Sequence, residues 1–365
     1  MELFDELAKR GHEQVAFFYD PHSKLKGIVA IHNTILGPAL GGCRMWNYVS
    51  EEAALEDSLR LAKGMTYKAA IAGLNLGGGK AVIIGNSKTQ KTENLFRSFG
   101  RFVEGLGGRY ITAEDVGTSI RDMEFVRMET SYVTGISQAL GGSGDPSPVT
   151  AYGVFIGIKA CVKERLDRTN LEGLKVSIQG LGHVGMCLCE NLHKEGAKLF
   201  VTDLDHTLMG QAVESYGATP VEPESIYELD VDVYAPCALG ATISPDTINK
   251  FKCTIIAGAA NNQLVENNFG IELKKRNILY APDYAINAGG LINVSNELEG
   301  YNRERAFTQA EGIYETLMEI FHRSNKEDIS TNKASDLQAE DRIQKIGDLK
   351  SFYLPYKKSF KIRNA

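Results

Sequence analysis

The segment that most restricts the fold of this chain is a run with glycine at its first, third and sixth positions. It comprises Gly180, Leu181, Gly182, His183, Val184 and Gly185. An apolar, strand-like run over 176–178 precedes it, and apolar residues at helical spacing over 184–192 follow it. Glycines between a strand and a helix let backbone N–H groups at the helix N-terminus meet a pyrophosphate. The spacing alone is weak evidence, but with both flanking elements it predicts a Rossmann-like dinucleotide-binding domain.

An acidic residue stands where such a domain needs one. Asp203 follows the next predicted strand, over 199–202, and lies 18 residues after Gly185. A carboxylate at this place accepts hydrogen bonds from ribose hydroxyls and repels a 2′-phosphate, so we expect NAD rather than NADP. His183, at a variable position of the loop, is not expected to take part in chemistry. A Rossmann-like domain that has lost its nucleotide would not need the three glycines and this acid together.

A second glycine-rich run leads into a lysine. Three consecutive glycines over 77–79 precede Lys80, and the apolar run over 81–84 is typical of a buried strand. We expect Lys80 to lie where a loop meets the core, in a backbone-lined crevice where a lysine can act as an acid or a base. The plain alternative is a glycine-rich turn whose lysine points to water. Lys68 upstream and Asp115, after a predicted strand over 110–113, favour the functional interpretation.

Length, charge and cysteine spacing narrow the class of protein. A chain of 365 residues is too long for one ordinary core, so we expect two domains. The formal net charge of −6 argues against nucleic acid as a partner. No apolar run approaches the ~20 residues of a membrane span, and the acidic N-terminus lacks a signal pattern, which predicts a cytoplasmic protein. The six cysteines lack CxxC spacing, so we expect them to be reduced and expect no metal site.

The first part of the chain mixes strands and helices. Strands are predicted over 14–19 and 27–31. A helix is predicted from the N-cap Ser50 to its end at Lys63-Gly64. A second helix is predicted over 92–106. Its inward face is expected to comprise Leu95, Phe96, Phe99, Phe102 and Val103.

The turn-rich run over 141–146 is typical of a hinge between domains. Ser147 and Pro148 then resemble an N-cap and a first helical residue. Short apolar strands over 176–178, 199–202, 231–234, 254–257 and 278–280 alternate with helices, which predicts a parallel sheet. Helices are also predicted within 289–326 and over 336–346, and the basic tail over 356–363 is interpreted as a solvated or partner-docked terminus.

Several separate motifs carry a family resemblance. They are the runs over 37–44 (Gly-Pro-Ala-Leu-Gly-Gly-Cys-Arg), 63–68 (Lys-Gly-Met-Thr-Tyr-Lys), 77–80 (Gly-Gly-Gly-Lys), 113–118 (Ala-Glu-Asp-Val-Gly-Thr), 146–153 (Pro-Ser-Pro-Val-Thr-Ala-Tyr-Gly) and 280–290 (Tyr-Ala-Pro-Asp-Tyr-Ala-Ile-Asn-Ala-Gly-Gly). With them the chain, over about 14–325, resembles the glutamate/leucine/phenylalanine/valine dehydrogenase family. The resemblance implies an α/β fold of two domains separated by a cleft. We expect a substrate-binding and oligomerisation domain over 1–140, joined by the C-terminal helices over 330–365, and an NAD-binding Rossmann domain over 141–329.

The resemblance also implies roles for the charged residues. Lys68 binds the substrate α-carboxylate, Lys80 is the catalytic lysine, and Asp115 moves protons at the substrate nitrogen. These residue types suit an oxidative deamination, in which hydride leaves Cα for nicotinamide and water attacks the resulting iminium. The remaining residues that the resemblance assigns to substrate are Gly41, Gly42, Met65 and Asn262. Those that it assigns to the cofactor are Thr150, Cys237, Ala238, Ala259 and Asn261, with the roles of the two asparagines left open.

Substrate choice depends on the side-chain end of the pocket. By resemblance Leu40, Ala113, Leu291 and Val294 line it. Leu40 replaces the lysine of glutamate-specific relatives, and an unpaired γ-carboxylate would be costly to bury, so glutamate is disfavoured. Leucine, valine and isoleucine are the expected substrates. Phenylalanine stays an alternative because Leu291 matches phenylalanine-preferring relatives whereas Ala113 does not, and a non-catalytic sensor of NAD or amino acid is a further alternative.

The expected partners are therefore small molecules: an amino acid or 2-oxo acid, ammonia and NAD. Family resemblance also implies a homo-oligomer, an octamer.

Overall fold

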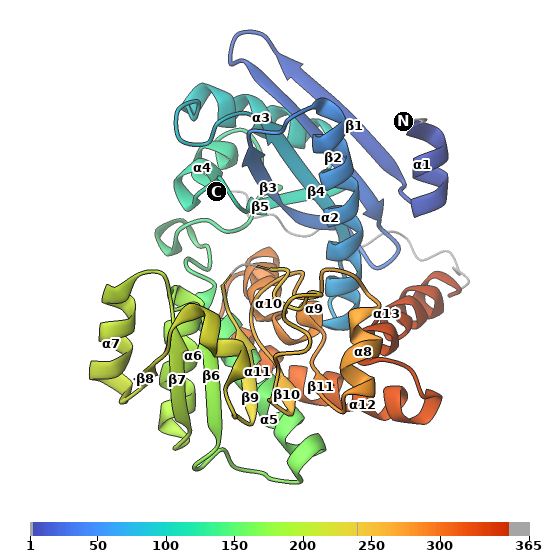
Figure 1. The fold of residues 1–365 in the computed structure, drawn as a ribbon. Helices are drawn as coiled ribbons and strands as arrows, with labels where there is room; N and C mark the ends of the chain where they lie inside the picture. Colours follow the sequence, from blue (N-terminus) through green and yellow to red (C-terminus); the bar gives the residue numbers. More distant parts are fainter. Residues whose placement is uncertain (1–2, 239, 350–365) are drawn as a thin grey trace. The chain divides into compact units, whose positions relative to one another are not determined.

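The computed structural model describes residues 3–238 and 240–349 (Figure 1). These residues divide into two units, each with its own sheet. Unit 1 holds the described residues up to Asp145, the segment Val294–Arg303 and the described residues from Ala339 onward. Unit 2 holds Pro146–Asn293 and Glu304–Gln338. The basic tail over 356–363 lies outside the described residues.

Unit 1 is built on a five-stranded mixed sheet of order β1-β2-β4-β3-β5. Its strands are β1 (Gln14–Asp20), β2 (Leu25–Asn33), β3 (Ala39–Trp46), β4 (Gly77–Ile84) and β5 (Tyr110–Glu114). β2 pairs antiparallel with β1 and β4, whereas β3 pairs parallel with β4 and β5. The strands predicted over 14–19, 27–31 and 110–113 are confirmed. β3 was not predicted, because its first half, Ala-Leu-Gly-Gly, lacks the β-branched residues typical of strands.

Helices cover both faces of this sheet (Figure 1). They are α1 (Leu3–Arg10), α2 (Glu51–Ile71), α3 (Glu93–Gly105) and α4 (Ile120–Arg127), followed by a short 3₁₀ turn, η1 (Gln138–Leu140). One apolar cluster joins the sheet to α2, and another joins the opposite face to α3 and α4. The helix predicted over 92–106 is confirmed, with Thr92 as N-cap. Phe102 was wrongly placed on its inward face: it is 37% exposed and stacks on Phe18, with ring centroids 5.2 Å apart.

The predicted end of α2 at Lys63-Gly64 is wrong. Ser50 caps the helix by accepting a hydrogen bond from the Ala53 N–H at 3.1 Å, but the helix continues to Ile71. A glycine inside a helix costs only about 1 kcal/mol, and burial of Thr66, Ala69 and other residues beyond it outweighs that cost. As a consequence Met65 and Lys68 lie on a helix.

The glycines before Lys80 belong to a strand and not to a loop. Gly77–Gly79 are the first residues of β4 and pair with both neighbouring strands. A Cβ atom on Gly78 would lie 2.1 Å from the Thr66 backbone nitrogen of α2, and one on Gly41 would lie 1.7 Å from the Gly79 carbonyl oxygen. Glycine is therefore required here by close backbone approach.

Unit 2 holds a parallel six-stranded sheet of order β11-β10-β9-β6-β7-β8. Its strands are β6 (Lys175–Gln179), β7 (Lys198–Thr202), β8 (Thr219–Pro220), β9 (Val233–Pro236), β10 (Ile255–Ile256) and β11 (Leu279–Tyr280). The five strands predicted from apolar runs are present, with ends shifted by a few residues, and β8 is additional. The reversal of strand order between β6 and β9 is typical of doubly wound nucleotide-binding folds.

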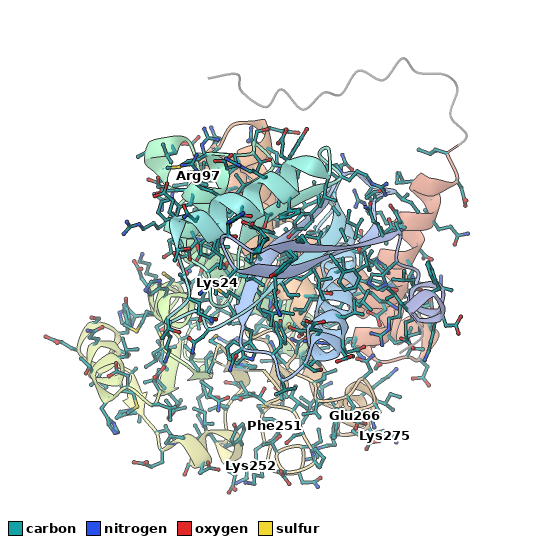
Figure 2. All side chains as sticks on the ribbon, turned by 90° about the horizontal axis from the view of Figure 1, so that it is seen from above. Lys24, Arg97, Phe251, Lys252, Glu266 and Lys275 are labelled. Atoms are coloured by element: carbon teal, nitrogen blue, oxygen red, sulfur yellow. The ribbon has the colours of Figure 1, made fainter. Side chains whose placement is uncertain are left out.

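Helices connect these strands and complete the chain. They are α5 (Ser147–Leu166), α6 (His183–Lys194), α7 (His206–Tyr216), η2 (Pro223–Glu228), α8 (Phe269–Lys275), α9 (Asp283–Ile286), α10 (Gly289–Ser295), η3 (Asn296–Glu299), α11 (Arg303–Glu311), α12 (Ile313–Glu327) and α13 (Thr331–Gly347). Ser147 was predicted as an N-cap, but it is the first helical residue and Pro146 occupies the cap. Phe251 is buried in the core of unit 2, whereas Lys252, Glu266 and Lys275 are exposed (Figure 2). No helix within the described part of the chain is long and apolar enough to span a membrane.

Candidate active site

Unit 1 brings two of the predicted catalytic residues into direct contact. Lys80 lies on β4 and is only 4% exposed, so the alternative of a lysine pointing to water is wrong. Its Nζ lies 2.8 Å from Oδ2 of Asp115, which follows β5 directly. Two oppositely charged side chains, one on β4 and one directly after β5, thus form a largely buried ion pair.

Strand register explains why further predicted residues accompany this pair. Leu40 of β3 pairs with Gly78 of β4, and Gly42 pairs with Ala113 of β5. Side chains that lie two residues apart on a strand, or opposite one another across strands, point to the same face. Leu40, Gly42, Lys80 and Ala113 therefore share the face that α2 covers. Leu40 is 2% exposed and Ala113 is buried.

Two further predicted residues, Met65 and Lys68, lie on α2 and are half-buried. They flank Thr66, whose backbone nitrogen occupies the space that a side chain at position 78 would need. Lys68 thus lies on the helix that covers the sheet face on which Lys80 lies.

Asp115 can occupy its position only because residue 42 has no side chain. A Cβ atom on Gly42 would lie 2.7 Å from the Asp115 Cβ and 2.6 Å from the Glu114 carbonyl oxygen. The carbonyl oxygen of the neighbouring Gly41 accepts a hydrogen bond of 2.5 Å from the Tyr110 hydroxyl. The absence of a side chain at Gly42 therefore makes room for Asp115.

The charges around Asp115 keep it ionised. Burial alone would raise the pKa of this carboxyl, but the charges of Lys80 and Arg44 and their hydrogen bonds lower it below its usual value. Arg44 of β3 donates from Nε to Asp115 Oδ2 at 3.0 Å. Sequence reasoning did not assign a role to Arg44, although it ends the motif over 37–44.

In unit 2 the glycine run over 180–185 links β6 to α6, with Gly182 as the N-cap. Gly180 has a φ of +99°, and a Cβ atom on Gly185 would lie 2.0 Å from the Gly180 carbonyl oxygen. A Cβ atom on Gly182, in contrast, would meet no protein atom within 4 Å. Gly182 thus faces open space at the N-terminus of a twelve-residue helix, which fits a pyrophosphate.

Asp203 is tied to this glycine loop. Its Oδ2 accepts a hydrogen bond of 2.6 Å from the Leu181 N–H, and its Oδ1 accepts one of 2.9 Å from the Asp205 N–H. The carboxylate is half-buried at the end of β7. His183 is exposed and Val184 is half-buried, both on the first turn of α6.

Cys237 and Ala238 follow β9 and border the same loop. The Cys237 N–H donates to the Gln179 carbonyl oxygen at 2.7 Å, and a Cβ atom on Gly180 would lie 2.7 Å from the Ala238 Cβ. Burial raises the pKa of the Cys237 thiol to about 11, so it stays protonated at neutral pH. These two residues can border a dinucleotide through backbone and small side chains.

A loop after β10 carries the remaining predicted residues of the cofactor end. Asn287, which the sequence reasoning did not single out, donates from Nδ2 to the Ala259 carbonyl oxygen and to Asn261 Oδ1, both at 2.9 Å. Asn262 is exposed, has a φ of +51° and accepts a hydrogen bond from the Ala241 N–H through its carbonyl oxygen. The backbone of Asn262 therefore forms a turn, whereas Asn261 is oriented by Asn287.

Thr150 lies in the first turn of α5, where its hydroxyl donates to the Pro146 carbonyl oxygen at 2.9 Å. A Cβ atom on Gly290 would lie 2.8 Å from the Thr150 hydroxyl oxygen. Leu291 of α10 is buried in unit 2, and Val294 of the same helix is half-buried in unit 1.

Neither metal ligands nor disulfides stand out in the described part of the chain. No group of three or more His, Cys, Asp or Glu side chains among those residues could hold a metal ion. None of the cysteines described there forms a disulfide, and four of them are buried.

Comparison with known proteins gives matches over nearly the whole chain. The model of the Glu/Leu/Phe/Val dehydrogenase dimerisation domain matches residues 12–132, and that of Glutamate/Leucine/Phenylalanine/Valine dehydrogenase matches 141–209 and 201–345. A leucine dehydrogenase of Bacillus cereus is 55% identical over 354 residues, which cover 97% of each chain. An L-tryptophan dehydrogenase of Nostoc punctiforme is 50% identical over 94% of this chain and 96% of its own. The crystal structure of L-tryptophan dehydrogenase from that organism aligns at 48% identity with a TM-score of 0.85, over 94% of this chain and 99% of its own.

Proposed function

The chain belongs to the glutamate/leucine/phenylalanine/valine dehydrogenase family, and we propose that it catalyses the NAD-dependent, reversible oxidative deamination of branched-chain L-amino acids to 2-oxo acids and ammonia. It is an amino acid dehydrogenase by its relatives and fold. The observation that carries the proposal is the buried Lys80–Asp115 pair on a sheet face that it shares with the apolar Leu40 and Ala113.

The charged residues of unit 1 divide the chemistry among them. Lys68 pairs with the substrate α-carboxylate as a point charge. Asp115 accepts a proton from the substrate ammonium, which frees the nitrogen lone pair to form the C=N bond. A nicotinamide cofactor held by the loop over 180–185 would supply the acceptor for the hydride that leaves Cα.

Hydrolysis of the iminium follows. Once Lys80 has released its ammonium proton to solvent, it accepts a proton from the water that adds to the iminium carbon, and Asp115 returns its proton to the nitrogen so that ammonia can leave. The 2-oxo acid forms as the carbinol oxygen gives its proton to the Asp115 carboxylate, which the preceding transfer has left ionised. Because Lys80 and Asp115 already touch in this structure, a proton can pass between them without rearrangement of either backbone.

We further propose NAD as the nicotinamide cofactor. The loop over 180–185 would hold the pyrophosphate, and Asp203 would bind the adenosine ribose hydroxyls. Support comes from the position of Asp203, which is hydrogen-bonded to the loop through Leu181. A 2′-phosphate would face this carboxylate and be repelled.

The apolar pocket end favours branched-chain substrates. Leu40 offers no partner for a γ-carboxylate, and leaving such a group buried and unpaired costs several kcal/mol. An aromatic substrate is the alternative, since L-tryptophan and phenylalanine dehydrogenases are 50% and 48% identical to this chain. One methylene changes discrimination by only ~1–3 kcal/mol, so leucine, valine and isoleucine should all react.

Steady-state kinetics with a substrate panel tests this function. We expect NADH formation with leucine, valine and isoleucine, at a kcat/KM above those for phenylalanine, tryptophan and glutamate. A higher kcat/KM for an aromatic amino acid would contradict the branched-chain preference. Binding of NAD and amino acid without turnover would instead identify a sensor.

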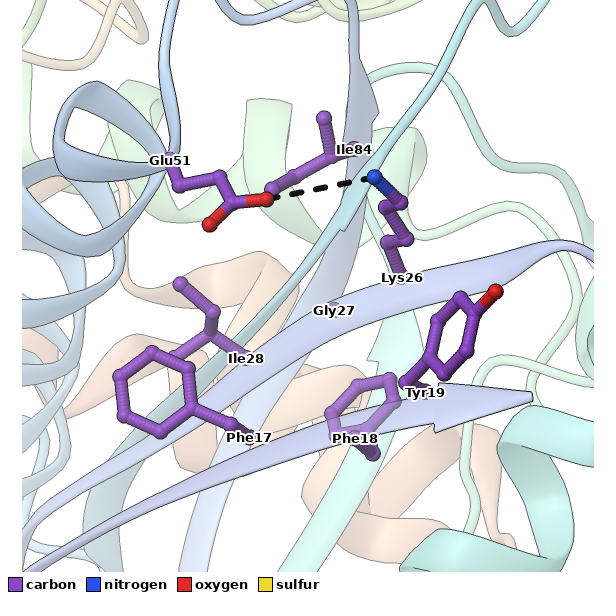
Figure 3. Close-up of a pocket in the computed structure, with 8 residues that line it drawn as sticks. All are labelled: Phe17, Phe18, Tyr19, Lys26, Gly27, Ile28, Glu51 and Ile84. Atoms are coloured by element: carbon purple, nitrogen blue, oxygen red, sulfur yellow. Dashed lines mark ion pairs between the residues drawn. The ribbon is translucent and has the colours of Figure 1, made fainter. Parts of the chain in front are cut away.

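We also propose a homo-oligomer, an octamer by family. Support comes from β1, the edge strand of its sheet, on which Phe17 and Tyr19 are exposed. Both side chains line a hollow, which Lys26 and Glu51 also line, and these two charged groups lie 4.0 Å apart (Figure 3). An unpaired strand edge with exposed aromatic side chains suits a second copy of the chain. Light scattering measures the mass in solution, and a monomer would contradict the proposal.

A further inference from the structure

A chain of alternating charges runs from the Lys80–Asp115 pair to the middle of α2. Asp115 Oδ2 accepts from Arg44 Nε at 3.0 Å, and Arg44 Nη1 donates to Asp57 Oδ2 at 2.9 Å. Asp57 Oδ1 accepts from Arg60 at 2.8 Å. The Tyr48 hydroxyl donates to the same Asp57 oxygen as Arg44, at 2.7 Å. We propose that Arg44 is a positioning residue for Asp115 and that Asp57 fixes Arg44 in that position, an inference that rests on the proposed function of Asp115.

The two cations that touch Asp115 occupy one oxygen. Both Lys80 Nζ and Arg44 Nε contact Oδ2, at 2.8 and 3.0 Å. With Oδ2 engaged by the two cations, Oδ1 is the oxygen that would accept a proton from a substrate ammonium. Without Arg44 the carboxylate would be held at one point only, by a lysine that must itself exchange protons during the reaction.

An arginine suits this place for two reasons. Its guanidinium stays charged throughout the working pH range, so it provides a constant cation while Lys80 gains and loses a proton. Its planar fork can donate to two carboxylates at once, as it does here through Nε and Nη1, whereas a lysine ammonium cannot reproduce that geometry. The Arg44 and Asp57 side chains are 22% and 16% exposed, so solvent screens their contact only in part.

Tyr48 and Asp57 have the protonation states that the positioning of Arg44 requires. Burial and the hydrogen bond to Asp57 raise the pKa of the Tyr48 hydroxyl, so it remains a donor. Burial would raise the pKa of Asp57, but the Tyr48 hydrogen bond and the Arg44 charge lower it. Other charged groups near Asp115 include Lys80 from β4 and Glu114, its neighbour in the chain, and the Lys91–Asp122 ion pair acts on Glu114.

The pH profile of kcat/KM for leucine separates a positioning role from a merely structural one. Arg44→Met removes the cation and keeps the apolar part of the side chain, so the pKa of Asp115 should rise. We therefore expect the acid limb of the profile, where kcat/KM falls at low pH, to move to higher pH by about one unit or more. Removal of a cation raises the apparent pKa of every group close to it, so this direction holds whichever nearby group limits the rate. Asp57→Asn removes an anion behind Arg44, so its acid limb should stay or move to lower pH while kcat falls.

Arg60→Met is the matched control. Arg60 contacts the same Asp57 carboxylate but is half exposed and does not touch Asp115. Its profile should match that of the wild type. A folded Arg44→Met enzyme with an unmoved acid limb would overturn the role of Arg44.

If Arg44→Met does not fold, Arg44→Lys serves as the test variant, because lysine keeps the positive charge but cannot donate to Asp115 and Asp57 in the geometry of the guanidinium. We expect its kcat to fall at least about tenfold at every pH with the limb in place, and a wild-type kcat would overturn the proposal. Failure of the proposed function looks different: the wild-type protein itself would form no NADH with any amino acid.

Discussion

At the scale of single residues, the candidate site depends as much on missing side chains as on charged ones. Gly42 leaves the space that Asp115 occupies, and Gly182 leaves open space at the start of α6. The two glycines differ in what fills that space, a protein side chain in one case and no protein atom in the other. Substitutions at these positions therefore affect the chemical step and cofactor binding separately.

Gly42→Ala should damage the chemical step. The added methyl group would lie 2.7 Å from the Asp115 Cβ, so Asp115 must shift from its present position. Displacement of a catalytic group by about 1 Å can cost roughly 100-fold in rate, and we expect a loss of kcat of that order. Affinity for NAD, measured by fluorescence titration, should not change. An unaltered kcat would show that the position of Asp115 does not limit turnover.

Asp203→Ser should weaken the preference for NAD over NADP by at least tenfold in kcat/KM. The substitution removes the negative charge that would repel a 2′-phosphate. It also removes the acceptor of the Leu181 N–H, so loop support and charge change together. Asp203→Asn keeps an acceptor oxygen and loses only the charge, and it should show the same change in preference. A preference for NADP in the wild type would refute this role of Asp203.

At the scale of elements, α2 is the part that sequence reasoning described least well. The N-cap at Ser50 was predictable because a short side chain before two glutamates is a local signal. The far end was not, because continuation through Gly64 is decided by packing against β4, which no local signal reports. For the same reason β3 was missed: its glycines fit a strand only because β4 and Asp115 approach it so closely.

Two glycine-to-alanine substitutions should show this packing directly. Gly64→Ala places its methyl group where no protein atom lies within 4 Å, so we expect α2 to be stabilised by about 0.5–1 kcal/mol. Gly78→Ala forces a Cβ to 2.1 Å from the Thr66 nitrogen and should lower the melting temperature sharply. Thermal unfolding followed by circular dichroism measures both. Equal shifts in the same direction would contradict the packing of α2 on β4.

At the scale of the whole molecule, the sequence predicted the α/β class, most strands of both sheets and the residues of the Lys80–Asp115 pair. These rest on local patterns: alternating apolar runs, glycine spacing and motif blocks. The contacts that support the site residues were not predictable from local patterns. Arg44 and Asp57 support Asp115, and Asn287 supports Asn261, through contacts between separate segments of the chain. The type of a charged residue indicates the chemistry that it can perform, but the register of the sheet decides which residue it contacts.

A buried histidine pair makes the stability of the whole fold depend on pH. His12 and His32 lie edge to face with ring centroids 4.8 Å apart, and both are buried. Their rings join α1, β2 and α2 through contacts with the Arg10 and Leu59 carbonyl oxygens and the Thr66 hydroxyl. Burial, the neighbouring His12 and Lys63 lower the pKa of His32 to about 4, and burial, Arg10 and Lys63 lower that of His12.

The folded state should therefore lose stability as pH falls below the ordinary histidine pKa of about 6.5. The unfolded chain binds protons there that the folded chain excludes, and the loss continues down to pH about 4. His32 alone accounts for about 3 kcal/mol over that window, since one pKa unit corresponds to ~1.36 kcal/mol. Protonated His12 would also present an N–H at Nδ1, which finds no hydrogen-bond partner among the described residues. The measurement is the melting temperature between pH 7 and 5.5, a range that lies above the pKa of ordinary carboxyl groups. The melting temperature should fall over this range in the wild type and fall less in His32→Gln. As a control, His206→Gln replaces an exposed histidine and should behave like the wild type. A wild-type melting temperature that stays constant over this interval would show that the pair does not control acid stability.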